Sequence, residues 1–131
     1  MMWKKRQVSV LAALFALALL CTARADETKA TDEGEAAQFK GKTVEMKDKG
    51  EFAVILACSA GKEVTATTKG DKETDVHLFV YDPSNKEVAK DISPGPKCEV
   101  KFTPATDGKY KLLVRNSGGT NSVTLEVKVA K

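Results

Sequence analysis

The chain has 131 residues, with 21 Lys plus Arg against 18 Asp plus Glu. The positive net charge comes from residues 1–25, which hold four basic residues and no acidic one. The remaining 106 residues carry 17 basic and 18 acidic side chains. A chain of this length makes one domain, and the lack of a concentrated basic patch excludes nucleic-acid binding as its function.

Residues 1–25 have the pattern of a signal peptide. A basic start, Lys4-Lys5-Arg6, precedes an apolar stretch over residues 8–20, which is too short to span a bilayer comfortably. Ala23-Arg24-Ala25 then supplies a small-x-small cleavage site. We expect cleavage after Ala25 and a secreted or periplasmic protein without a stable membrane span. 

A lipoprotein signal ending at Cys21 is the alternative to this cleavage. Such signals place a small residue directly before the cysteine, whereas this chain has Leu20 there. The simple signal peptide is therefore favoured over a lipid anchor.

Residues 26–38 are polar, charged and poor in apolar side chains, so we predict a flexible leader there and a domain over 39–131. From Glu51 onward, apolar residues fall on every second position, as expected of strands with one buried and one polar face. The positions that share the apolar parity are Phe52, Val54, Leu56 and Cys58; Val76, Leu78 and Val80; Cys98, Val100 and Phe102; Tyr110, Leu112 and Val114; and Val123, Leu125, Val127 and Val129.

Turn-forming sequences such as Asp82-Pro83-Ser84-Asn85 separate these runs. The pattern predicts an all-β fold, a single antiparallel β-sandwich that is jelly-roll-like. About eight strands are expected, over residues 39–46, 51–58, 63–68, 75–81, 86–90, 97–102, 109–115 and 120–130.

Two cysteines, Cys58 and Cys98, remain after the signal peptide is removed. Both have the inward parity of their strands, and an exported protein meets an oxidising compartment. We therefore predict a disulfide between them.

Catalytic residues are scarce in this sequence. His77 is the only histidine, the cysteines are expected to be paired, and no Gly-x-Ser-x-Gly motif is present. We predict that the protein is not an enzyme; a hydrolase in its own right would have to depend on His77.

Asp71, Glu73 and Asp75 alternate just before a predicted strand, and oxygen ligands at alternate positions can converge on Ca²⁺. The other interpretation is a solvated loop, in which Lys69 and Lys72 partly neutralise the carboxylates. Calcium is thus a candidate ligand, and no other cofactor is expected.

His77, Phe79 and Tyr81 have the parity opposite to the apolar residues of their strand. Three rings facing outward together suit stacking on sugar rings or contact with a partner polypeptide. The alternative is that Phe39 or the N-terminal segment folds over them and makes a second small apolar cluster.

Several stretches resemble the bacterial pre-peptidase C-terminal domain, over roughly residues 50–129. The resemblance is carried by Asp75-Val76-His77-Leu78-Phe79-Val80-Tyr81-Asp82-Pro83, Ser84-Asn85-Lys86-Glu87-Val88-Ala89, Val100-Lys101-Phe102-Thr103-Pro104 and Asp107-Gly108-Lys109-Tyr110-Lys111-Leu112-Leu113-Val114-Arg115. It implies a jelly-roll-like sandwich in a secreted protein. Members of that family usually follow a secreted peptidase or other enzyme, and some relatives bind collagen or other polymers with help from calcium.

These observations favour a secreted, non-catalytic binding or accessory module that engages an extracellular or periplasmic protein or polysaccharide, and we expect a monomer. The alternative is an inhibitor or folding helper of a secreted hydrolase, with the rigid loop Ser93-Pro94-Gly95-Pro96 entering the enzyme's cleft.

Overall fold

A computed structural model describes residues 29–131, so the predicted signal peptide lies outside the described residues. This part of the chain forms nine strands and one short 3-10 helix, η1 (Ala36–Gln38). The strands are β1 (Ala30–Glu35), β2 (Lys42–Met46), β3 (Glu51–Cys58), β4 (Val64–Gly70), β5 (Asp75–Tyr81), β6 (Glu87–Asp91), β7 (Cys98–Phe102), β8 (Gly108–Ser117) and β9 (Asn121–Val129).

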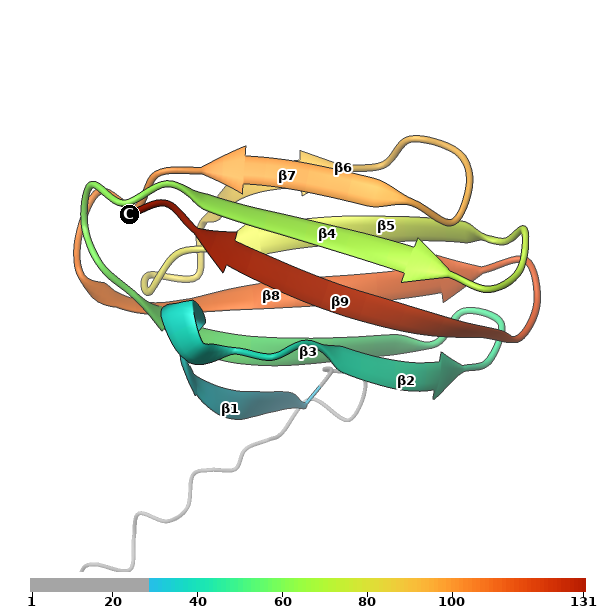
Figure 1. Cartoon of the computed structure of the whole chain (residues 1–131). Coiled ribbons are helices and arrows are strands. Elements are labelled where there is room, and N and C mark those ends of the chain that lie inside the picture. The colour runs from blue at the N-terminus through green and yellow to red at the C-terminus, as the bar shows by residue number, and fades with distance from the viewer. Residues whose placement is uncertain (1–28) are drawn as a thin grey trace, which may run out of the picture.

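The strands make two sheets that pack face to face (Figure 1). One sheet has the order β1-β3-β8-β5-β6 and the other has the order β2-β9-β4-β7. Strands β2 to β9 pair antiparallel within their sheets, and their order is that of a jelly roll. The all-β sandwich predicted from the alternating pattern is confirmed.

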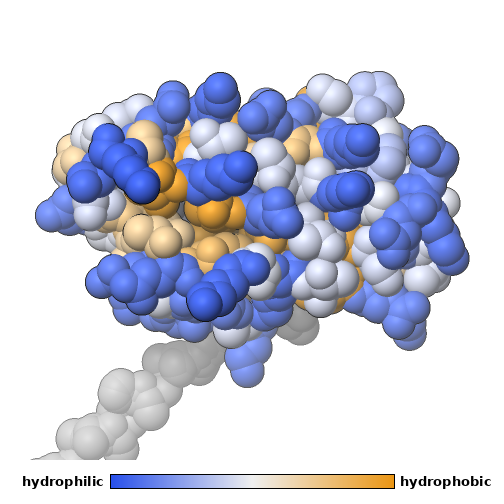
Figure 2. Space-filling model, viewed as in Figure 1, coloured by the Kyte–Doolittle hydropathy of each residue, from blue (hydrophilic) through white to orange (hydrophobic). Residues whose placement is uncertain are grey.

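The inward parity of each strand supplies the core between the sheets. Each buried Val or Leu side chain stabilises the fold by about 1.5–3 kcal/mol. The fully buried apolar residues include Val54, Leu56, Val76, Leu78, Val80, Leu112, Val114, Val123 and Leu125. The outward side chains of β4 and β9 include Thr65, Thr67, Glu126 and Lys128, and Figure 2 shows polar residues over much of this face with apolar surface toward one end.

The N-terminal segment differs from the prediction of a flexible leader. Residues 30–35 form β1, which pairs parallel with β3, and η1 inserts Ala36 into the core. Asp32 and Glu33 of β1 form ion pairs with Lys109 and Lys42, each at 2.9 Å. A polar segment can add a strand here because the edge of β3 offers backbone donors and acceptors, whatever the side chains of its partner.

The predicted Cys58–Cys98 disulfide is wrong, because the two residues lie near opposite ends of the sandwich. Cys58 is opposite Gly108, whereas the Cys98 thiol lies 2.7 Å from the carbonyl oxygen of Val76, which is opposite Asn116. Gly108 and Asn116 are eight residues apart along β8, which is about 26 Å at about 3.3 Å per residue. A disulfide requires Cα atoms within about 7 Å. Both cysteines are buried free thiols, and burial raises the pKa of each to about 11.

A buried polar network closes the end of the sandwich that holds Cys98. The Thr74 hydroxyl donates to Asn116 Oδ1 at 2.6 Å and accepts from Asn121 Nδ2 at 2.8 Å. Asn116 Nδ2 also donates to the carbonyl oxygens of Lys47 and Gly119, so side chains satisfy backbone groups of the surrounding loops.

Candidate binding face

The aromatic residues of β5 lie on the outer surface of the five-stranded sheet. His77, Phe79 and Tyr81 are half-buried, while the alternating Val76, Leu78 and Val80 are 0% exposed. The outward direction predicted from parity is therefore confirmed.

Strand β8 places a basic or apolar side chain beside each ring. His77 is opposite Arg115, Phe79 is opposite Leu113, and Tyr81 is opposite Lys111. Lys111 Nζ lies 4.9 Å from the Tyr81 ring centroid, and Arg115 Cζ lies 5.2 Å from the Phe79 ring centroid. Each such cation–π contact contributes about 0.5–1 kcal/mol at an exposed site. We call these six residues the ring face.

The ring face has an apolar floor that continues into β3. Leu113 is 8% exposed although it points outward, and Ala53 opposite it is 2% exposed. Phe39 packs against the main core, and β1 pairs at the edge of β3, so among residues 29–131 neither forms the cover that the alternative interpretation required. The rings and Leu113 instead make one strip across β5 and β8.

Charges on the ring face are partly neutralised. Arg115 Nε is paired with a carboxylate oxygen of Glu51, whereas Lys111 forms no ion pair with the described residues. At the β6 side, burial raises the pKa of Asp91, but hydrogen bonds from Ser93 and Glu99 and the charge of His77 outweigh it, so this pKa lies below its ordinary value. Lys111 is thus the basic group most available to a ligand.

The carboxylates considered for calcium are not brought together. Asp71, Glu73 and Asp75 are all exposed, and Asp75 Oδ1 accepts a hydrogen bond from Gly95 N at 3.0 Å. Within residues 29–131, no three His, Cys, Asp or Glu side chains form a group that could hold a metal ion.

The loop Ser93-Pro94-Gly95-Pro96 is tied to both sheets. Gly95 N donates a hydrogen bond to Asp75 Oδ1, and the Gly95 carbonyl oxygen accepts one from Val76 N. The carbonyl oxygen of Pro96 accepts a hydrogen bond from Gly70 N at 3.1 Å. Ser93 and Pro94 remain exposed at its tip.

Three members of the ring face, Lys111, Leu113 and Arg115, were not found from the sequence. Their outward direction follows from the inward parity of Tyr110, Leu112 and Val114, but their contact with the rings depends on β8 lying beside β5. That pairing joins segments distant along the chain, which alternation within one strand does not indicate.

The jelly-roll order and the ring face together define a small β-sandwich domain with one polar and one partly aromatic outer surface. No family model and no curated protein matches the chain. In the part that the structure describes, no helix is both long and apolar enough to cross a membrane.

Three solved structures share this fold. The pre-peptidase C-terminal domain of collagenase from Bacillus anthracis has a TM-score of 0.60 at 18% identity, covering 78% of this chain and 97% of that one. PliG of Aeromonas hydrophila, a periplasmic inhibitor of g-type lysozyme, gives 0.54 at 15% identity, with 77% and 99% covered. CorA of Methylomicrobium album BG8, a surface-associated copper-binding protein, gives 0.61 at 11% identity, with 78% and 98% covered. The expected resemblance to the pre-peptidase C-terminal domain is confirmed as a likeness of fold.

Proposed function

We propose that the protein is a secreted, non-catalytic binding module that engages an extracellular or periplasmic protein or polysaccharide through the ring face. The observation that carries this proposal is the contrast between the two outer surfaces of the sandwich. On one, the outward side chains of β4 and β9 are polar, whereas the other presents Phe79 and Tyr81 beside Leu113. 

The chemistry of the ring face suits a flat ligand surface. Phe79 and Tyr81 bury much apolar area for little loss of side-chain freedom when they stack on sugar rings or on a partner's apolar residues. Lys111 can then donate hydrogen bonds to hydroxyl, carbonyl or carboxylate oxygens. The fold likeness to a collagenase domain and to a periplasmic inhibitor supports a location outside the cytoplasm.

Binding is tested with the natively exported protein as bait, and the affinity is measured for the captured polymer or protein after purification. Phe79→Ala with Tyr81→Ala should abolish binding. The matched control is Thr65→Ala with Thr67→Ala on the outer surface of β4, which should bind normally. All four residues are half-buried, so the melting temperature of each double variant is measured first, and affinities are compared between variants that stay folded. A folded ring-face variant with unchanged affinity would contradict the proposal.

A second candidate function is inhibition of a secreted hydrolase, supported by the fold likeness to the periplasmic lysozyme inhibitor. The exposed tip formed by Ser93 and Pro94 would then enter the enzyme's cleft. An assay against purified lysozymes tests it: Pro94→Ala should weaken inhibition, and the ring-face variant should not.

A further inference from the structure

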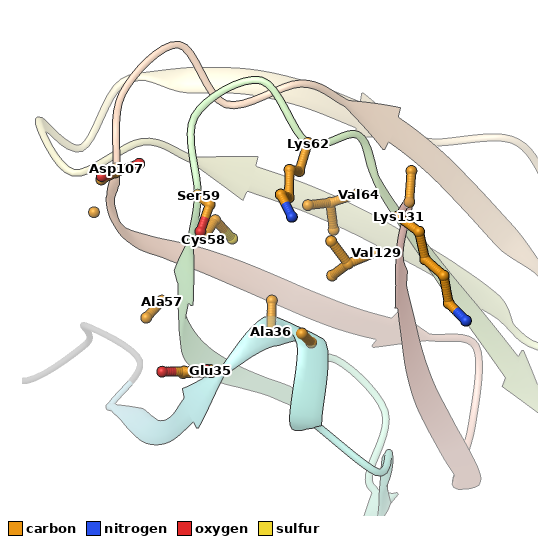
Figure 3. Close-up of a pocket in the computed structure, with 13 residues that line it drawn as sticks. Glu35, Ala36, Ala57, Cys58, Ser59, Lys62, Val64, Asp107, Val129 and Lys131 are labelled. Atoms are coloured by element: carbon orange, nitrogen blue, oxygen red, sulfur yellow. The ribbon is translucent and has the colours of Figure 1, made fainter.

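One end of the sandwich is hollow. An open cavity of about 720 Å³ lies beside η1 and the last residues of β9 (Figure 3). Its floor is made by Ala36, Cys58 and Val64, all buried, and its wall includes the half-buried Val129. Apolar surface gathers at this end of the molecule (Figure 2). The network of Thr74, Asn116 and Asn121 lies at the other end of the sandwich.

Two lysines, Lys62 and Lys131, line the cavity, and the ammonium of Lys131 points away from its floor (Figure 3). The Lys62 side chain points into the cavity above Cys58 and Val64 (Figure 3), and it forms no ion pair with the described residues. Asp107, which also lines the cavity, accepts a hydrogen bond from Ala60 N at 2.7 Å and so holds the turn that carries Lys62. Glu35 lines the cavity but points away from its floor (Figure 3).

This combination indicates the chemical class of a ligand. Sites for small molecules are usually about 300–1,000 Å³ in volume, mainly apolar, with a few polar groups that orient the ligand. An apolar floor with one ammonium directed at it, that of Lys62, is complementary to an apolar chain that ends in one negative charge. A doubly charged phosphate would call for more cations or converging backbone N–H groups.

We propose that this cavity binds a small amphipathic carboxylate, with its apolar chain between η1 and strands β3, β4 and β9 and its carboxylate on Lys62. Cys58 contributes only apolar surface to the site. The site lies at the end of the sandwich, whereas the ring face lies on the outer surface of β5 and β8, so the two proposals stand or fall separately.

Sodium decanoate, below its micelle concentration, is a suitable probe. In amide-resolved NMR titrations of the exported protein, the signals of Cys58, Lys62, Val64 and Val129 should shift saturably. Lys62→Gln should weaken binding by about fivefold, which corresponds to an exposed charge pair of about 1 kcal/mol. Lys97→Gln, at an exposed lysine outside the cavity, is the matched control and should leave the affinity unchanged.

Two further measurements separate the parts of the proposal. Ala37→Trp places a bulky side chain at the exposed rim of the cavity and should abolish the shifts while the protein stays folded. Decylammonium should bind more weakly than decanoate to the unaltered protein. The Phe79→Ala and Tyr81→Ala variant should bind decanoate normally. The proposal is overturned if decanoate causes no saturable shifts, if the shifts fall on the ring face, or if Lys62→Gln and Lys97→Gln behave alike.

Discussion

The guanidinium group of Arg115 lies over the ring of Phe79, with 5.2 Å between Cζ and the ring centroid, while its Nε bonds to Glu51. The Phe79 and His77 rings are also nearly perpendicular to each other, with 6.3 Å between their centroids. Neighbours on β3, β5 and β8 thus hold this ring in one orientation before any ligand arrives. A preorganised ring loses less conformational entropy on binding, which favours affinity.

Arg115→Gln removes both the cation over Phe79 and the ion pair with Glu51. We expect the free energy of unfolding to fall by about 1 kcal/mol, because both contacts are near the surface. Urea denaturation measures this change. Lys101→Gln, an exposed change on β7, should have almost no effect. Equal losses for the two variants would mean that the Arg115 contacts contribute nothing.

The raised pKa values of the two buried thiols predict a fall in the free energy of unfolding at high pH. Burial raises the pKa of Cys58 and Cys98 from 9.0 to about 11, so above pH 9 the unfolded chain releases thiol protons that the folded chain retains. The stabilisation is complete below about pH 9 and is lost as the pH rises through about 11. Unfolding midpoints between pH 8 and 11 should therefore fall less steeply in a Cys58→Ala and Cys98→Ala variant, which separates the thiols from the lysines and tyrosines that also titrate there.

The same thiols should be unpaired in the natively exported protein. Alkylation after unfolding, without a reducing agent, should label both Cys58 and Cys98, and peptide mapping should find no linked peptides. A linked pair would require the two ends of the sandwich to come together and would contradict the fold.

Asn116→Ala should be among the most destabilising single changes outside the apolar core. It leaves the carbonyl oxygens of Lys47 and Gly119 and the hydroxyl of Thr74 without this partner. We expect a loss of about 2–3 kcal/mol, the cost of unsatisfied buried polar groups. Thr120→Ala, at an exposed position in the neighbouring turn, should change the stability by less than about 0.5 kcal/mol. Chemical denaturation of both variants provides the comparison.

Export remains a prediction from residues 1–25. The intact mass of protein isolated from its native host should correspond to a chain that starts at Asp26, and Trp3, the only tryptophan, should be absent. A lipid-modified N-terminal Cys21 would contradict this and move the protein to a membrane surface.

Alternation predicted the strands because it reports which side chains of one strand share a face. It placed Phe79 and Tyr81 outward and Cys58 and Cys98 inward correctly. It does not report position along the sandwich, which the register with β8 decides, and for this reason the disulfide prediction was wrong. Likewise, Asp71, Glu73 and Asp75 alternate in sequence, but the loop turns before β5 and Asp75 bonds to Gly95.

Strand β1 was missed for a different reason. Its sequence, Ala-Thr-Asp-Glu-Gly-Glu, buries almost no apolar side chain, and its conformation depends on the backbone of β3 beside it. Strand formation of this kind comes from tertiary pairing rather than from local preference.

The pairing of β1 with β3 determines how much of the N-terminal segment can be removed without exposing a strand edge. A chain beginning at Phe39 would keep the predicted domain but leave one edge of β3 open along Glu51–Cys58. An uncovered edge of this length and apolar character is a template for pairing with another molecule. We expect a chain that begins at Phe39, which also lacks the buried Ala36 of η1, to self-associate more readily than the untrimmed protein. Sedimentation of the trimmed and untrimmed proteins would show the difference, and a larger species only after trimming would make the acidic β1 segment a guard of this strand edge.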